Sequence, residues 1–310
     1  MFDLCCNNTT LHLSRRVHVM GILNVTPDSF SDGGRFLRLD DAVRRAEEMV
    51  AEGADLIDVG GESSRPGSDP VPLDEELDRV IPVVEALAKR IPAPISVDTY
   101  KAEVARRALD AGAVLVNDIS AMRFDPRMKE LIAERGVPVI LMHMLGTPRD
   151  MQISPSYEDV IKEISVFLRD RIAEAVSAGI ARTQIVVDPG IGFGKRVADN
   201  LEIVRRLDAF HALGCPILLG PSRKSFIGKA LDLPSEERLE GTAAVVALSV
   251  LRGAHLIRVH DVRQMVRVVR MVEAIERGGE EKQKSEARGQ RPEVNGQKSE
   301  GGGCQLIVDR

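Results

Sequence analysis

Charged and amide side chains recur along the sequence, each close to the end of a short apolar run. They are Asn24, Asp58, Asp98, Asn117, Asp188, Ser222, Arg223, Lys224, Arg258 and His260. One such residue is usually structural, for example as a cap on the next helix, which is what we expect for Asp118 and Asp261. Unpaired charges are seldom placed beside a protein core, so the repetition indicates a site.

The cationic residues of this set could bind phosphate. Arg258 and His260 are two residues apart, so on an extended strand their side chains point the same way. A guanidinium and an imidazole beside the Asn24 amide could hold a phosphate and its divalent ion. Two alternatives stay open at this point: Arg258 could form a salt bridge with a carboxylate, and His260 could cap a helix.

The acidic and amide residues of the set could bind a flat heterocycle. Asp98, Asn117 and Asp188 offer acceptors to adjacent ring N–H groups, and Lys224 can donate to a ring carbonyl or nitrogen. Each of them alone could equally be a structural hydrogen-bonding group. The run G-P-S-R-K-S is expected to open a short helix, whose free N–H groups favour an anion near Ser222. The sequence lacks H-E-x-x-H, a cysteine pair and a nucleophile elbow, which disfavours hydrolysis by those routes.

Eight strand–helix units are predicted to position these side chains. The strands are expected at His18–Asn24, Leu56–Val59, Ile95–Val97, Val114–Val116, Val137–Met142, Ile185–Val187, Pro216–Leu219 and Ala254–Val259. Helices are expected between them, including one capped by Asp40, one opened by a Ser156–Asp159 capping box, one over Asn200–Leu213 and an apolar one over Gly241–Leu251. The apolar helix must be covered on more than one side.

This alternation predicts the α/β class and a closed (β/α)8 TIM barrel, in which the strand ends converge on one face. An open doubly wound sheet is the alternative, but its dinucleotide fingerprint is absent from the first strand–helix turn. We expect one domain at residues 17–277, after a lead-in at 1–16. Residues 278–310 are nearly devoid of apolar side chains until the last few, so a disordered tail is expected.

Composition narrows the functional classes. With 44% hydrophobic residues, 3% aromatic residues and no Trp in the 310-residue chain, the core must be aliphatic. The formal charge of −5 gives no reason to expect a nucleic acid or an anionic membrane as partner. The N-terminus has no signal-peptide pattern and the four cysteines have no disulfide or metal spacing, so a cytoplasmic protein with reduced thiols is expected.

Seven motifs resemble dihydropteroate synthase, a pterin-binding family, between about Val17 and Glu276. They are G-I-L-N-V-T-P-D-S-F-S-D-G-G, D-V-G-G-E-S-S-R-P-G, S-V-D-T, V-N-D-I-S, L-M-H-M-x-G-T-P, D-P-G-I-G-F-G-K and G-P-S-R-K-S-F-I-G, in the order of that family. The resemblance implies a transferase that joins 6-hydroxymethyl-dihydropterin diphosphate to p-aminobenzoate in folate biosynthesis. The products are dihydropteroate and diphosphate, and sulfonamides act on the family by mimicking p-aminobenzoate.

The resemblance also implies site residues. The pterin contacts are Asp98, Asn117, Met142, Asp188, Gly220 and Lys224; the diphosphate contacts are Asn24, Ser64, Arg65, Arg258 and His260; the p-aminobenzoate contacts are Phe30, Ser64, Arg65, Pro66, Phe193, Ser222 and Lys224. Asn24 would bind Mg²⁺, and Asn24, Asp98, Asp188, Lys224, Arg258 and His260 would be catalytic. Ser64 stands where Thr is frequent but keeps the hydroxyl.

The expected reaction is a dissociative substitution, in which diphosphate leaves before the arylamine attacks. Loops at Thr26–Phe36 and Gly61–Gly67 would close over it and exclude water. A pterin-dependent methyltransferase and a non-catalytic pterin-binding paralogue are the alternative functions. A homodimer is expected, because the apolar helix near Gly241–Leu251 would otherwise be exposed.

Overall fold

The computed structural model describes residues 2–7, 9–26 and 35–278, except for the side chains of 35–38. The chain divides into two compact units, residues 1–273 and 274–310. The predicted tail, Phe30 and most of the first predicted loop lie outside the described residues, so these predictions remain untested. All described strands lie in the first unit.

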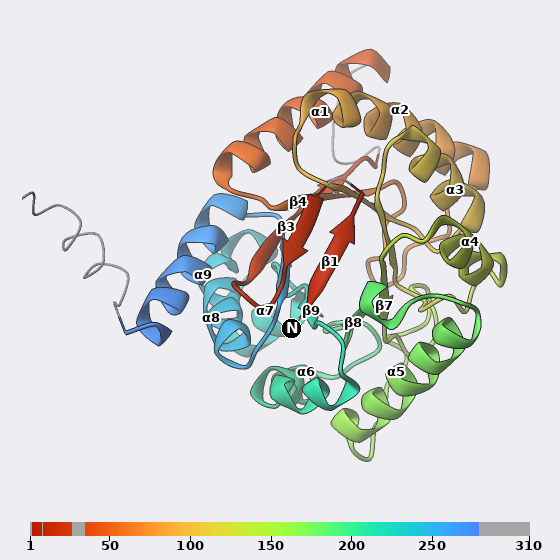
Figure 1. The fold of residues 1–310 in the computed structure, drawn as a ribbon. Helices are drawn as coiled ribbons and strands as arrows, with labels where there is room; N and C mark the ends of the chain where they lie inside the picture. Colours follow the sequence, from red (N-terminus) through yellow and green to blue (C-terminus); the bar gives the residue numbers. More distant parts are fainter. Residues whose placement is uncertain (1, 8, 27–34, 279–310) are drawn as a thin grey trace, which may run out of the picture. The chain divides into compact units, whose positions relative to one another are not determined.

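Eight parallel strands form the centre of this unit, as predicted (Figure 1). They are β3 (His18–Asn24), β4 (Leu56–Gly60), β5 (Ile95–Asp98), β6 (Leu115–Asp118), β7 (Val139–Met142), β8 (Ile185–Asp188), β9 (Leu218–Leu219) and β10 (Leu256–Val259). Their order is β8-β7-β6-β5-β4-β3-β10-β9, and a parallel bridge between Val187 and Ile217 joins the two ends. The sheet therefore closes into the predicted TIM barrel, and the open-sheet alternative is wrong.

Helices surround the strands. They are α1 (Arg35–Glu52), α2 (Leu73–Arg90), α3 (Ala102–Ala111), α4 (Arg127–Arg135), α5 (Val160–Ser177), α6 (Val197–Arg205), α7 (Ser225–Leu231), α8 (Leu239–Leu251) and α9 (Val262–Glu276), with 3-10 turns at 182–184, 207–213 and 235–237. Among the described residues, no helix is long and apolar enough to cross a membrane.

Three helix predictions need correction. Asp40 does not cap α1, because that helix already begins at Arg35. The cap of α5 is Asp159, whose carboxylate accepts from the N–H groups of Ile161 and Lys162, and its reciprocal partner is Glu163, which accepts from the Asp159 N–H. The helix predicted over 200–213 is two elements, because α6 ends at Arg205 and a 3-10 turn follows. Periodicity does not separate the two, since they present one continuous apolar face.

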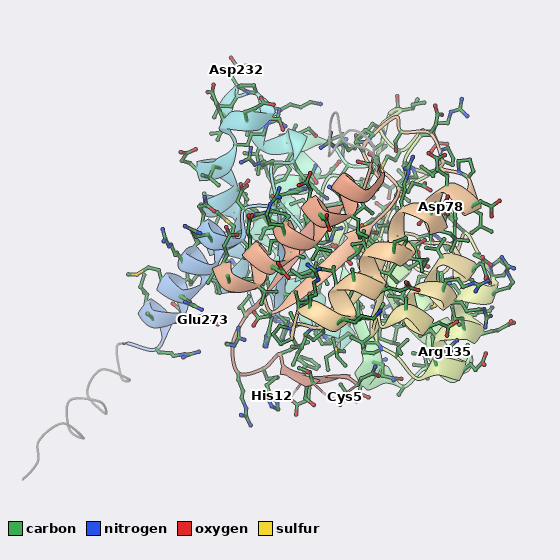
Figure 2. The ribbon with its side chains drawn as sticks, turned by 90° about the horizontal axis from the view of Figure 1, so that it is seen from above. Cys5, His12, Asp78, Arg135, Asp232 and Glu273 are labelled. Carbon is green, nitrogen blue, oxygen red and sulfur yellow. The ribbon has the colours of Figure 1, made fainter. Side chains whose placement is uncertain are left out.

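A β-hairpin closes the barrel at the end where its strands begin. Strands β1 (Asp3–Cys6) and β2 (Thr9–His12) pair in antiparallel fashion within the predicted lead-in. Leu4 and Leu11 are buried against inward-facing residues of the barrel, including Met20, Leu56 and Leu115. Figure 2 shows Cys5 and His12 of this hairpin at the opposite end of the molecule from Asp232. Apolar residues inside the barrel are thereby removed from water.

Strand register places polar side chains at a common level. Asn24 of β3 is in register with Gly60, Gly60 with Asp98, and Asp98 with Asn117. On the far side of the barrel, Asp188 ends β8 in register with Met142. The strands are buried and largely aliphatic, and most of the predicted polar site residues lie at or close to their carboxyl ends.

Candidate active site at the carboxyl ends of the strands

Arg258 connects three strands at the rim. Its Nε donates to Asp58 Oδ2 at 2.6 Å, and its Nη2 donates to Asp98 Oδ2 at 2.6 Å. Asp58 Oδ2 also accepts from Asn117 Nδ2 at 2.9 Å. The salt bridge left open for Arg258 is therefore present, and it brings Asp98 and Asn117 into one cluster.

Two carboxylates share this one guanidinium. Burial, opposed by Arg258 and reinforced by the nearby Asp58 carboxylate, raises the pKa of Asp98 to about 7. Asp98 is therefore poised to change charge near neutral pH. Glu76 and Asp118 also act on it with negative charge.

A second cluster surrounds Lys224. Burial lowers the pKa of Lys224 to about 7, although the carboxylates of Asp188 and Asp98 act in the opposite direction. Its ammonium donates to the Ile191 carbonyl and lies 4.1 Å from the centroid of the Phe193 ring. Burial also raises the pKa of Asp188, whose Oδ1 accepts from Gly190 N–H at 2.7 Å. Lys224 and Asp188 thus belong to the same charged site as Asp98.

The glycines of the loop after β8 allow this close approach. Gly192 has φ +83°, and a Cβ there would lie 2.7 Å from Lys224 Cδ. Gly190 has φ +69°, and a Cβ would lie only 1.9 Å from the His143 carbonyl oxygen. Both positions therefore require the absence of a side chain as well as a left-handed backbone.

A buried lysine holds the other end of this loop. Lys195 is 3% exposed, and its Nζ lies 2.9 Å from both His143 Nδ1 and the Phe193 carbonyl oxygen. Burial lowers the pKa of Lys195 well below its ordinary value and lowers that of His143 to about 2. Both groups are therefore favoured in the neutral form, and Lys195 links the Phe193 carbonyl to His143.

His260 and Asn24 meet where β10 lies beside β3. Asn24 Nδ2 is 3.5 Å from His260 Nε2, and His260 Nδ1 is 3.0 Å from Ser222 Oγ. Burial lowers the pKa of His260 to about 4, with contributions from Arg258 and Arg65. Asn24, Ser222, Arg65 and His260 therefore lie close together, as expected for a site that takes an anion.

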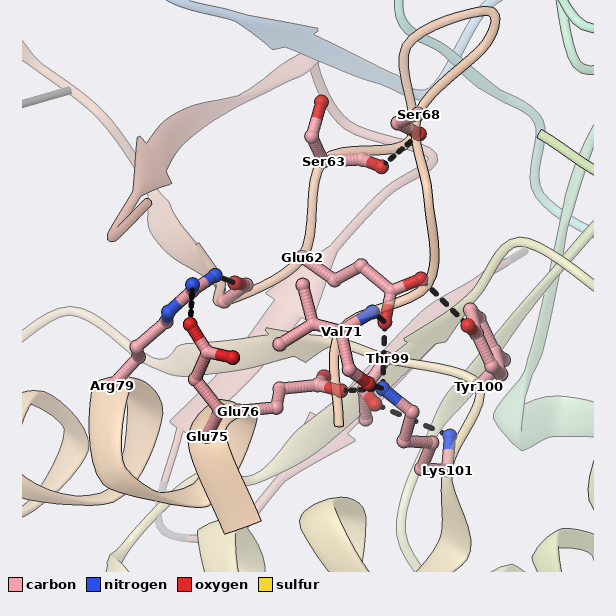
Figure 3. A network of polar contacts seen from close by, with 11 residues as sticks. Glu62, Ser63, Ser68, Val71, Glu75, Glu76, Arg79, Thr99, Tyr100 and Lys101 are labelled. Carbon is pink, nitrogen blue, oxygen red and sulfur yellow. Dashed lines mark hydrogen bonds and ion pairs between the residues drawn. The ribbon is translucent and has the colours of Figure 1, made fainter. Parts of the chain in front are cut away.

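The loop after β4 is anchored at its base (Figure 3). Lys101 Nζ donates to Glu62 Oε2 at 2.6 Å and to the Val71 carbonyl at 2.7 Å, and it also pairs with the buried Glu76. Tyr100 donates its hydroxyl to Glu62 Oε1 at 2.6 Å. Between these anchors Ser64 is half-buried, while Arg65 and Pro66 are exposed. The predicted lid therefore has a rigid base and an exposed tip.

The remaining predicted site residues fall around these clusters. Met142 is buried with Ile119, Met144 and Met151, and Phe193 packs against that group. Gly220 is half-buried, and a Cβ there would lie 3.6 Å from Arg258 Cβ. Phe30 lies outside the described residues.

Comparisons with known proteins decide the family. A model of pterin binding enzymes matches residues 20–260. Dihydropteroate synthase of Escherichia coli K12 is 50% identical over 271 residues, which is 87% of this chain and 95% of that protein. The enzyme of Bacillus subtilis is 48% identical over 272 residues, covering 87% of this chain and 93% of that protein.

The chain belongs to the dihydropteroate synthase family. Solved structures of the family have the same fold. The Yersinia pestis dihydropteroate synthase with a sulfonamide drug complex has a TM-score of 0.84 and 47% identity, covering 89% of this chain and 99% of that one. The Xanthomonas albilineans dihydropteroate synthase with 4-aminobenzoic acid has a TM-score of 0.83 and 45% identity, covering 88% of this chain and 98% of that one.

As a member of this family, the protein is a transferase of folate biosynthesis. It condenses 6-hydroxymethyl-dihydropterin diphosphate with p-aminobenzoate, forming dihydropteroate and diphosphate. The resemblance found in the sequence motifs is therefore confirmed, and with it the transferase class.

Three features of the site were missed from the sequence. Lys195 and His143 form a buried pair, Lys101 anchors the loop after β4, and Asp58 received no role of its own. The lysine that closes G-I-G-F-G-K and the aspartate near the end of the second strand were visible signals. Their partners are far away in the sequence, so only the fold pairs them.

Proposed function

We propose that the rim performs the condensation by dissociative substitution, with the pterin ring between Asp98, Asn117, Asp188 and Lys224. This assignment rests on one observation above all: these four residues and Arg258 form one electrostatically linked group at the strand ends. Carboxylate and amide oxygens would accept from the ring N–H groups, and Lys224 would donate to the ring. Met142 and Gly220 would line the pocket.

Diphosphate departure would occur at the cationic side of the site. The bond between the pterin methylene and the diphosphate oxygen breaks first, leaving a cation on the pterin. Arg258, His260, Asn24, Arg65 and Ser64 would bind the diphosphate, because the first four lie near one another where β10 meets β3 and Ser64 precedes Arg65 in the loop after β4. Asp98 and Asp188 would stabilise the cation electrostatically. Their carboxylates are buried, where charges interact more strongly than in water.

The p-aminobenzoate amine would then attack the methylene, and its N–H proton would leave to water. Phe193, Ser222, Lys224, Pro66, Arg65, Ser64 and Phe30 are the proposed contacts. In support, the Lys224 ammonium lies over the Phe193 ring, and Ser222 is buried beside His260. The family structures with 4-aminobenzoic acid and a sulfonamide support the same binding class for this protein.

Mg²⁺ is the proposed cofactor, and Asn24 fits it. The Asn24 amide nitrogen lies toward His260, which leaves its oxygen available. No group of three His, Cys, Asp or Glu side chains among the described residues could hold a metal by itself. Mg²⁺ accepts such a site, since it commonly binds one or two protein oxygens together with substrate phosphates and water. When bound, it would neutralise charge on the diphosphate.

A homodimer through α8 is also proposed. Thr242, Val246 and Ser249 are buried against the barrel, but Leu248 is 49% and Leu251 50% exposed. The expected cover on more than one side is therefore not supplied by the described part of this chain. A second copy would bury that face.

The cytoplasm remains the proposed compartment. The described cysteines Cys5, Cys6 and Cys215 are free thiols, the state expected in a reducing environment.

Two variants test which residues bind the pterin and which bind the diphosphate. Asp188→Asn should weaken binding of 6-hydroxymethyl-dihydropterin by about tenfold or more, because a charged acceptor is lost from a buried pocket. Arg258→Ala should weaken diphosphate binding more than pterin binding. Titration calorimetry with each ligand measures both effects, and the reverse order for Arg258→Ala would contradict the assignment.

A further inference from the structure

Asp58 is a buried carboxylate directly beneath the polar rim. It is 0% exposed, and its Oδ2 accepts both from Asn117 Nδ2 at 2.9 Å and from Arg258 Nε at 2.6 Å. Its Oδ1 is buried without a hydrogen-bond partner among the described residues, as is the hydroxyl of Ser96, its register neighbour. One oxygen atom therefore carries both contacts of this side chain.

The contact with Asp58 fixes which way the Asn117 amide faces. A carboxylate accepts hydrogen bonds only, so the NH₂ group of Asn117 must lie toward Asp58. The Asn117 oxygen accepts no hydrogen bond from the described residues, and it is not among their fully buried unpaired atoms. Asn117 therefore presents an acceptor to a ligand. A flipped amide would present NH₂ and would repel a ring N–H donor.

The same carboxylate oxygen orients Arg258. Asp58 holds the guanidinium by Nε and Asp98 holds it by Nη2, so two carboxylates define the plane of the group. Its Nη1 has no hydrogen-bond partner among the described residues and is not among their buried unpaired atoms. This leaves one nitrogen for a ligand on a guanidinium that cannot rotate freely.

We propose that Asp58 is a positioning residue for the transferase reaction, which turns the Asn117 oxygen toward the pterin edge and fixes the guanidinium plane of Arg258. This inference rests on the roles proposed above for Asn117 and Arg258. Asp58 acts through these two side chains and needs no contact with substrate.

Two substitutions separate orientation from charge. In Asp58→Asn, an amide oxygen can still accept from both donors, so affinity for 6-hydroxymethyl-dihydropterin diphosphate should stay within about threefold. In Asp58→Ala the Asn117 amide is released, and the KM for that substrate should rise about tenfold or more. The KM for p-aminobenzoate should change little in either variant.

A pH profile gives an independent readout. Asp58, Glu76 and Asp118 all raise the pKa of Asp98 by their charge, and Arg258 lowers it. Removing the Asp58 charge in Asp58→Asn should therefore move the acid limb of kcat/KM for the pterin substrate to lower pH. If Asp58→Ala fails to fold, Asp58→Asn still decides the question: a rise of about tenfold or more in its KM for the pterin substrate would show that the two orienting contacts do not suffice, and would overturn the proposal.

Asp118→Asn is the matched control. Asp118 is also 0% exposed and ends β6, but among the described residues its carboxylate accepts only from Ser120 and from Met122 N–H. Measured well above the Asp98 pKa of about 7, where Asp98 is ionised in every variant, Asp118→Asn should lower stability without changing either KM. Equal increases in both KM values for Asp58→Ala, or none, would overturn the proposal.

Asn117→Ala tests the underlying function separately, since normal pterin affinity there would refute the role of Asn117 itself.

Discussion

At the scale of single residues, the site combines groups whose charge is set by burial. Asp98 and Lys224 both have a pKa of about 7, one raised and the other lowered from its ordinary value. Ionised Asp98 accumulates above pH 7, whereas protonated Lys224 is lost above it. The proposed reaction needs ionised Asp98 together with protonated Lys224, and these two forms coexist mainly near pH 7.

We therefore expect kcat/KM for the pterin substrate to be bell-shaped with a maximum near pH 7. In Lys224→Arg the high-pH limb should move upward by about two pH units or more, because a guanidinium keeps its proton. The measurement is a steady-state profile from pH 5 to 10. An unchanged high-pH limb in Lys224→Arg would contradict the assignment of that limb.

Sequence reasoning identified the residues of the rim but not their mutual contacts. Asp98, Asn117 and Arg258 were predicted from their positions at strand ends, because those positions follow from strand order alone. That Asp58 holds two of them could not be predicted, since Asp58 and Arg258 are 200 residues apart in the chain. Such a contact depends on barrel closure and side-chain rotamers, which periodicity does not report.

At the scale of elements, the barrel could be predicted from the pattern of buried strands. The hairpin that closes the barrel where its strands begin could not. The hairpin β1–β2 lies in a stretch predicted only as a lead-in. Its strands have four residues each, with only cysteine, asparagine and threonine residues between the two buried leucines in the sequence. So short an alternating run carries too weak a signal to be recognised without the barrel against which it packs.

Leu4 tests the contribution of this hairpin. It is 0% exposed and belongs to the cluster that includes Met20 and Leu56. Leu4→Ala should lower the free energy of unfolding by about 2–5 kcal/mol, because it leaves a cavity inside the barrel. Urea denaturation measures the change. Cys5→Ser, on the exposed face of the same strand, should cost about 0.5 kcal/mol or less; equal costs would contradict the proposed packing.

At the scale of the whole molecule, α8 exposes Leu248 and Leu251 in the single chain, and a dimer through this helix is proposed. Leu248→Glu should shift the protein from dimer to monomer, because a carboxylate would have to be buried at the interface. Sedimentation velocity at micromolar concentration measures the change. Val166→Glu on α5, a position 42% exposed in the single chain, is the control and should leave the dimer intact. A dimer that persists in Leu248→Glu would place the interface elsewhere.

The proposed reaction requires that the rim of one barrel both releases diphosphate and joins the pterin to an arylamine. Purified protein with Mg²⁺ and 6-hydroxymethyl-dihydropterin diphosphate should therefore release diphosphate in amounts that follow added p-aminobenzoate and match the dihydropteroate formed. No release, or release that does not depend on p-aminobenzoate, would contradict this account.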